Sequence, residues 1–165
     1  MRHKIAALAG LLLCSCTGAP PATMPHPVMP PESVLIVTES SEFKQAVVAK
    51  VTAALTASGR SFRVADLKAL DEARSQEHQA VVILNEIWAG RLSGKVRHFL
   101  QRIAPALRGK IILVSTAGQA SWQAQEEGID AITSASTVAD QQRIADFILG
   151  KIEALLAFTA TVTQS

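Results

Sequence analysis

Three hydroxyl side chains lie where an apolar run meets a helical pattern. Thr38, Ser40 and Ser41 come at the end of VLIVT (34–38) and before the helical spacing that begins near Phe43. A loop between the first strand and the first helix of an α/β domain often binds a phosphate group, because free backbone N–H groups and the positive end of the helix dipole attract an anion. The three hydroxyl groups can donate further hydrogen bonds to it.

Two carboxylates in the same loop disfavour phosphate binding. Glu39 and Glu42 would lie near the negative charge of the phosphate, at a cost on the order of 1 kcal/mol per charge pair even in water. Lys44 offsets part of that charge. A second interpretation fits the same residues: Ser40 or Ser41 is the N-cap of the helix, and Glu42 lies favourably in its first turn. Both interpretations are open on sequence alone.

Two later loops combine an aromatic or hydroxyl side chain with small residues. The first is NEIWAGRLSG (85–94) and the second is STAGQASW (115–122). The candidate binding residues in these loops are Trp88, Ala89, Gly90, Thr116, Ala117 and Gly118. A tryptophan in such a loop stacks on a ligand, packs on the surface of its own domain or faces a partner. The second loop is equally a glycine-bearing turn before a short helix.

The chain that positions these loops alternates apolar strand-like runs with amphipathic helical patterns. The predicted strands cover 34–38, 61–67, 80–86, 110–118 and 129–133. The predicted helices begin near Phe43, at Lys95 and after Thr137, where Thr137 and Asp140 approximate a capping box for a last helix to about Phe158. Five strands alternating with helices predict a mostly parallel sheet covered on both faces, with ligands beyond the carboxyl ends of the strands.

The segments AVVILNEIWAGRLSGKVRHFL (80–100) and LRGKIILVSTAG (107–118) resemble the flavodoxin-like family. The resemblance covers Val34 to Phe158. It implies an α/β fold, a three-layer sandwich in which a five-stranded parallel sheet has helices on both faces. It also implies FMN as cofactor, used for electron transfer or for reduction of a small acceptor, so that an enzymatic activity would be that of an FMN-dependent oxidoreductase.

The resemblance assigns roles to the loop residues. Thr38, Ser40 and Ser41 would contact the FMN phosphate. Trp88 would stack on the isoalloxazine ring, Ala89 and Gly90 would offer backbone amides to its edge, and Thr116, Ala117 and Gly118 would make a third contact. The family pattern [ST]-x-T-G-N-T is degenerate here, because Ser41, Glu42 and Phe43 replace Gly, Asn and Thr. The alternative is a flavodoxin-like fold that has lost FMN and serves as an envelope binding or assembly module.

The amino terminus has the pattern of a bacterial lipoprotein leader. MRHK supplies positive charge, and IAALAGLLL supplies nine apolar residues, fewer than the 20 or so needed to span a membrane. LCSC (13–16) resembles a lipobox whose lipidated residue, a target for palmitate among other acyl chains, is Cys16. An ordinary cleaved leader with a Cys14–Cys16 disulfide is the alternative, although one intervening residue makes such a bridge strained.

The predicted organisation follows from these segments. Residues 1–15 form the lipoprotein signal peptide, 16–33 the lipidated cysteine and a proline-rich tether, 34–158 the flavodoxin-like domain, and 159–165 a C-terminal tail. We expect a membrane partner through Cys16, attachment in the bacterial cell envelope on the periplasmic side of the outer membrane rather than the inner, and an envelope protein as a further partner.

The composition disfavours other functions. The net charge is +2 and no basic block occurs, so nucleic acid is not expected as a partner. His78 and His98 lack neighbouring Cys, His or carboxylates at metal-ligand spacing, so no metal site is expected.

Overall fold

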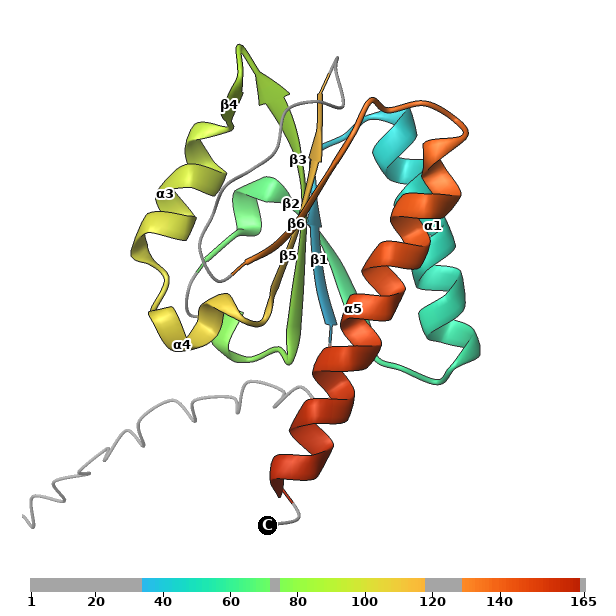
Figure 1. Ribbon diagram of the computed structural model, residues 1–165, viewed down its shortest axis with the longest axis vertical. Helices are drawn as coiled ribbons and strands as arrows, with labels where there is room; N and C mark the ends of the chain where they lie inside the picture. The colour runs from blue at the N-terminus through green and yellow to red at the C-terminus, as the bar shows by residue number, and fades with distance from the viewer. Residues whose placement is uncertain (1–33, 72–74, 118–128, 164–165) are drawn as a thin grey trace, which may run out of the picture.

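The structure, a computed structural model, describes residues 34–71, 75–117 and 129–163. The leader, the tether and Gly118 therefore lie outside the described residues, as does the short helix predicted over 121–128. The described chain forms three layers, with a twisted sheet in the middle and helices on both faces (Figure 1). The amino end of the first strand and the end of the last helix lie at one end of the molecule, and the carboxyl ends of the parallel strands lie at the other.

The sheet has six strands in the described residues. They are β1 (Val34–Thr38), β2 (Phe62–Asp66), β3 (Ala80–Trp88), β4 (Arg91–Leu92), β5 (Ile111–Thr116) and β6 (Asp130–Ser134). Five of them are parallel, in the order β2-β1-β3-β5-β6, and the two-residue β4 pairs with β3 in the antiparallel direction. This is the doubly wound order of flavodoxin-like sheets, which confirms the predicted fold class.

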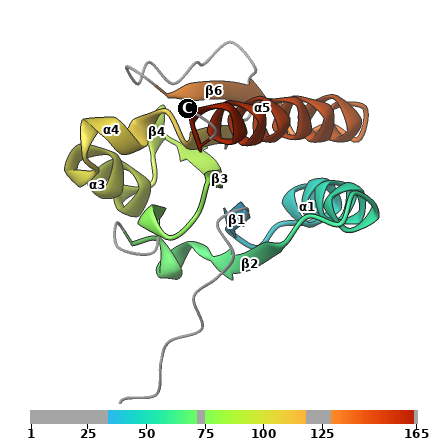
Figure 2. The same ribbon diagram turned by 90° about the horizontal axis from the view of Figure 1, so that it is seen from below.

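Helices cover the two faces in pairs. The helices are α1 (Glu42–Ala57), the 3₁₀ helix η1 (Leu67–Ala69), α3 (Gly94–Arg102), α4 (Pro105–Arg108) and α5 (Asp140–Thr163). Viewed along the strands, α1 and α5 lie on one face of the sheet and α3 and α4 on the other (Figure 2). None of the helices in the described ranges is long and apolar enough to cross a membrane.

Alternating side chains of the central strands fill both faces. On β3, Val82 and Leu84 join the core with α1 and α5, whereas Val81 and Ile83 join the core with α3. Both sets are almost fully buried, as expected for a parallel strand between two helical layers. The rigid central strands β1, β3 and β5 thus fix the position of the loops that follow them.

Several predicted boundaries were wrong for local reasons. The strand over 80–86 continues to Trp88 because it pairs with β4, so the predicted loop is largely a hairpin. The helix over 95–107 ends at Arg102, and Pro105 begins the separate helix α4, where its missing N–H costs nothing. The last helix continues to Thr163, so residues 159–163 of the predicted tail are helical.

Candidate functional site

The loop that connects β1 to α1 has three residues, and its hydroxyl groups are bonded within the loop and helix. Ser41 is the N-cap of α1 and accepts a hydrogen bond from the Lys44 N–H at 3.3 Å. Ser40 Oγ accepts from Gln45 Nε2 at 3.2 Å, and Thr38 Oγ1 donates to the Glu39 carbonyl at 2.9 Å. The capping interpretation is therefore confirmed for Ser41.

An ion pair stabilises the same loop from inside. Lys44 Nζ lies 3.1 Å from Glu39 Oε2 and 4.0 Å from Glu86 Oε2, and the lysine is only 1% exposed. Glu39 Oε2 also accepts the backbone N–H of Glu86 at 3.1 Å. One carboxylate oxygen thus joins the loop after β1, the first turn of α1 and the end of β3.

Sequence reasoning missed the ion pair, although one signal was present. Lys44 occupies the stripe of α1 that otherwise carries the buried residues Val47, Val51 and Leu55. A lysine at a helical position that faces the core must pair with a carboxylate or extend its amino group to water. Glu39, five residues earlier, is the partner that this signal identifies.

The loop does not fit the phosphate of FMN. A phosphate binds well where N–H groups and a lysine are available to it, but here the Glu39 carboxylate already takes both Lys44 Nζ and the Glu86 N–H. Glu42 and Glu86 add two further negative charges near one cation. The serine at position 41 replaces the glycine that would permit close backbone approach.

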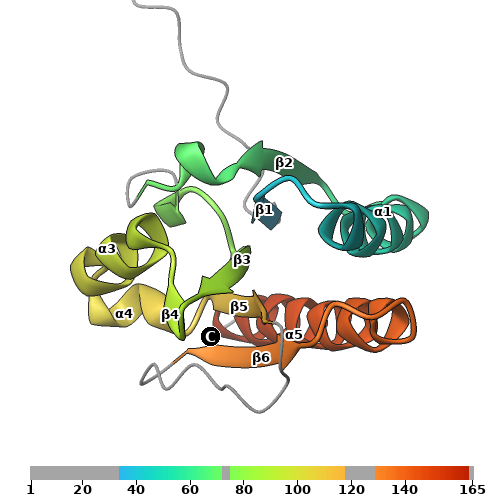
Figure 3. The same cartoon turned by 90° about the horizontal axis from the view of Figure 1, so that it is seen from above.

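The hairpin formed by β3 and β4 extends beyond the carboxyl edge of the sheet (Figure 1), and the view from that edge shows β4 beside β3 (Figure 3). Its two turn residues, Ala89 and Gly90, have φ of 49° and 73°, as a tight two-residue hairpin requires. Trp88 and Arg91 are the paired residues that close the turn. Trp88 is 80% exposed, so it neither packs on its own domain nor lines a cavity of the described chain. Of the predicted interpretations, this exposure disagrees with packing on the domain surface, and it fits both stacking on a ligand and facing a partner.

Replacing Trp88 with alanine should change the free energy of unfolding by less than about 0.5 kcal/mol, because the side chain buries little area. Leu84→Ala in the same strand is the matched control. Leu84 is 1% exposed, and its loss should cost about 2–5 kcal/mol. Urea unfolding followed by circular dichroism measures both values. A loss above about 1 kcal/mol for Trp88→Ala would mean that the ring packs on the domain.

Buried polar groups lie beneath the hairpin. Asn85 and Ser115 are register partners on β3 and β5, and both are fully buried. Asn85 Oδ1 accepts the N–H of Ser93, the N-cap of α3, at 3.3 Å. Asn85 Nδ2 and Ser115 Oγ have no hydrogen-bond partner within the described part of the chain. Since buried polar groups are normally hydrogen-bonded, this pair of atoms is an exception in the core of the sheet.

Thr116 and Ala117, which were predicted to make the third cofactor contact, form hydrogen bonds within the edge of the sheet. Thr116 is 4% exposed and donates through Oγ1 to the Asn85 carbonyl at 3.3 Å, and the Ala117 N–H donates to the Ser134 carbonyl at 2.9 Å. Gly118 lies outside the described residues. The candidate residues that the structure brings to one edge are therefore Thr38, Ser40, Ser41, Trp88, Ala89, Gly90, Thr116 and Ala117.

The end of β6 is organised around Asp140. Hydrogen bonds from Arg143 and then Thr137 hold the pKa of the Asp140 carboxyl below its ordinary value. The Thr137 hydroxyl donates to this carboxylate, so the two residues of the predicted capping pair are in contact. The helix α5 begins at Asp140, two residues later than a capping box with Thr137 as N-cap would place it. Ser136 has a φ of 60°, a strained value for a residue with a side chain.

The histidines have no metal-binding arrangement. No group of three His, Cys, Asp or Glu side chains able to hold a metal ion occurs in residues 34–71, 75–117 and 129–163. His78 is buried, and burial lowers the pKa of its imidazole, which favours the neutral form.

Comparison with known proteins identifies the fold and no closer relationship. No family model matches the chain, and no curated protein matches it. Solved structures do match. They include a flavodoxin from the domain Archaea (13% identity, TM-score 0.55, 74% of this chain and 98% of that chain). A second is the two-electron reduced flavodoxin of Megasphaera elsdenii (16% identity, TM-score 0.57, 75% of this chain and 98% of that chain). A third is flavodoxin 2 of Bacillus cereus (15% identity, TM-score 0.54, 74% of this chain and 99% of that chain).

These matches cover nearly the whole of each flavodoxin and about three quarters of this chain. At identities of 12–16% they establish a flavodoxin-like fold. The binding properties of the carboxyl edge must be argued from its own residues.

Proposed function

We propose that this protein is a flavodoxin-like binding or assembly module of the bacterial cell envelope, anchored through lipid on Cys16, whose carboxyl edge contacts a protein partner in place of FMN. The observation that carries the proposal is the Glu39 carboxylate bonded to Lys44 Nζ and to the Glu86 N–H. The positive groups of the first loop are neutralised from within the chain, and the anion that an FMN site needs would meet three carboxylates there.

The exposed hairpin supports the same proposal. Trp88 is a large aromatic side chain, 80% exposed, at the tip of a hairpin whose turn is fixed by two residues with positive φ. Exposed aromatic residues on a rigid element are typical of contact points for a partner, because their burial contributes much and costs little side-chain entropy.

The direction of the chain supports a site that faces away from the anchoring membrane. Val34 begins β1 at the end of the sheet opposite to the hairpin (Figure 1). A tether entering at Val34 would thus place the amino ends of the strands nearer the membrane, and Trp88 would point into the periplasm. Outer-membrane attachment is the favoured location, since Thr17 follows the proposed lipidated cysteine where Asp is linked to inner-membrane retention.

A second candidate function is electron transfer by bound FMN, or FMN-dependent reduction of a small acceptor. It is favoured by the fold shared with flavodoxins and by the buried, unpartnered Asn85 Nδ2 and Ser115 Oγ close to the candidate ring contacts. FMN bound there would supply one- or two-electron chemistry. The loop after β1 fits the FMN phosphate poorly, because the carboxylates of Glu39, Glu42 and Glu86 would repel it.

Titration of the protein into FMN distinguishes the two candidates. We expect no quenching of flavin fluorescence at protein concentrations up to about 10 μM, because loop charge opposes the phosphate. Riboflavin is the matched control, since it carries the ring without the phosphate. Quenching of FMN at micromolar protein would overturn the first candidate and support the second. Equal quenching of FMN and riboflavin would assign binding to the ring contacts around Trp88 alone.

A further inference from the structure

A second concave surface lies on the α3 face of the molecule, away from the loop after β1. It is a groove between η1 and α3 with a cavity volume of about 690 Å³. Its charged lining residues are Lys68, Lys95, Arg102 and Asp71, and His98 lines it as well. The remaining wall is largely apolar and includes Leu67, Leu70 and Phe99. This volume is in the range of ligand sites in proteins.

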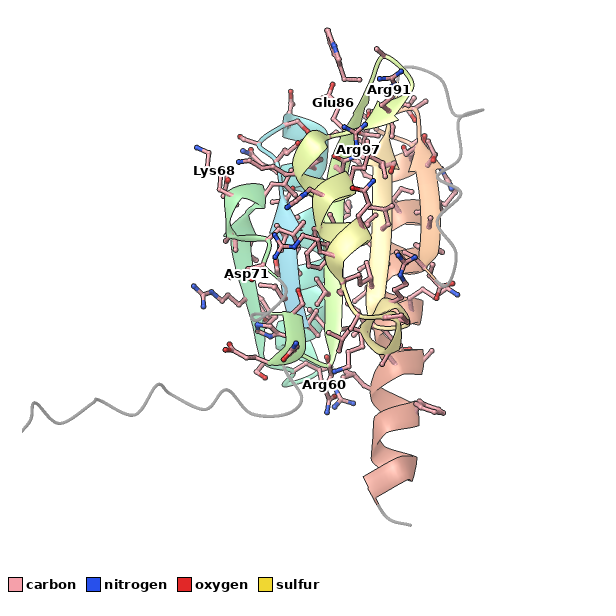
Figure 4. All side chains as sticks on the ribbon, turned by 90° about the vertical axis from the view of Figure 1, so that its left-hand side faces the viewer. Arg60, Lys68, Asp71, Glu86, Arg91 and Arg97 are labelled. Atoms are coloured by element: carbon pink, nitrogen blue, oxygen red, sulfur yellow. The ribbon has the colours of Figure 1, made fainter. Side chains whose placement is uncertain are left out.

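The positive charges are arranged along one helix face. Lys95 and Arg102, seven residues apart, lie about 10 Å from each other along α3, and His98 lies between them on the same face. Lys68 lies on the facing wall, on η1. Figure 4 shows Lys68 and Asp71 on that wall, and Arg97 on the other side of α3.

The cations of the groove are available for a ligand. Neither Lys68 nor Lys95 has an ion-pair partner among the described residues. Arg102 donates from Nη1 to His98 Nε2 at 3.3 Å, which holds the guanidinium beside the groove and leaves its other N–H groups to bind. Among the described lining residues, the three cations Lys68, Lys95 and Arg102 outnumber the one carboxylate, Asp71.

We propose that this groove binds an acidic, partly apolar peptide segment of a partner protein. Two cations about 10 Å apart on α3, with Lys68 on the facing wall, match carboxylates spaced along an extended chain better than one compact anion. The apolar wall accommodates the intervening side chains. A bilayer surface is flat and fits a concave groove poorly. The proposal does not depend on whether the carboxyl edge binds FMN.

The test uses the full-length chain held in nanodiscs of phosphatidylcholine. The probe is a fluorescein-labelled peptide of four alternating Glu-Leu pairs, followed by fluorescence anisotropy at low ionic strength. The comparison peptide has Gln in place of every Glu. We expect the acidic peptide to bind, the Gln peptide to bind at least about tenfold more weakly, and added salt to weaken binding because the cations are exposed.

Variants locate the binding to the groove. Lys95→Gln with Arg102→Gln should weaken the acidic peptide about fivefold or more, because two exposed ion pairs are lost. Lys50→Gln with Arg97→Gln removes the same charge from exposed positions outside the groove and should leave the affinity unchanged. Lys68→Gln, on the facing wall, should also weaken binding. A loss in this variant would show that the effect of the double variant is not a structural change confined to α3.

Three outcomes would overturn the proposal. One is absence of binding by the wild-type chain at about 100 μM. Another is an equal loss of affinity in the groove variant and in the matched control variant. The third is that phosphatidylglycerol vesicles bind the chain through Lys95 and Arg102 and the acidic peptide does not bind. That result would assign the groove to a lipid surface.

Discussion

Replacing Glu39 with glutamine is expected to lower the free energy of unfolding by about 2–3 kcal/mol. The amide keeps the shape of the side chain and removes its charge, which leaves Lys44 buried at 1% exposure with only Glu86, 4.0 Å away, to balance it. Breaking a fully buried pair costs about 3–5 kcal/mol. The smaller value follows because Glu39 is 29% exposed and Glu86 remains within reach.

The reverse substitution should cost much less. Lys44→Met removes the buried charge and keeps an unbranched apolar stem on the buried face of α1, and the Glu39 carboxylate that remains is partly solvated. We expect a loss of no more than about 1 kcal/mol. The double variant should resemble Lys44→Met, since the neutral amide at position 39 then has no buried charge to balance. A thermodynamic cycle of the four proteins measures the coupling.

The control for this prediction is Glu42→Gln, the same chemical change three residues away. Glu42 is exposed in the first turn of α1, where its carboxylate interacts with the helix dipole, so its loss should cost about 0.3–1 kcal/mol. Urea unfolding followed by circular dichroism at pH 7 gives all the values. A greater loss for Lys44→Met than for Glu39→Gln would contradict the view that the carboxylate serves mainly to balance a buried lysine.

This ion pair shows why the fold could be predicted from the sequence more fully than the site. The fold depends on periodicity: apolar runs such as VLIVT and AVVIL alternate with helical stripes, and helices on both sides of a parallel sheet bury both faces of such strands. Ser41 as N-cap is equally local. Residues within a few positions of one another decide it, so the sequence contains the answer.

The site depends on contacts between distant segments, which one sequence does not reveal. Glu39 and Glu86 are 47 residues apart, and only the parallel pairing of β1 with β3 brings the Glu86 N–H to the Glu39 carboxylate. Asn85 and Ser115 similarly become neighbours through the register of β3 with β5. The β3–β4 hairpin was missed because a strand of two residues has no period to detect, although Ala89-Gly90 is a possible turn.

Cys16→Ala is expected to move most of the protein from the membrane fraction to the soluble fraction. The structure describes residues from Val34 onward, and no helix there spans a membrane, so attachment in our proposal depends on acyl chains at Cys16. Each buried CH₂ contributes about 0.8 kcal/mol, and stable attachment needs more than one chain or signal. The apolar run IAALAGLLL (5–13), nine residues long, is too short to hold the uncleaved variant across a bilayer, which takes about 20 residues.

Cys14→Ala is the matched control for this prediction, because it removes the other cysteine of LCSC and leaves the residue expected to be lipidated. Fractionation with labelled palmitate should show Cys14→Ala labelled and membrane-bound, and Cys16→Ala unlabelled and soluble. Loss of both label and attachment in Cys14→Ala alone would place the lipid on Cys14. If both variants and the wild-type chain were soluble and unlabelled, the leader would be an ordinary cleaved one, and the carboxyl edge with Trp88 would have no fixed direction relative to a membrane.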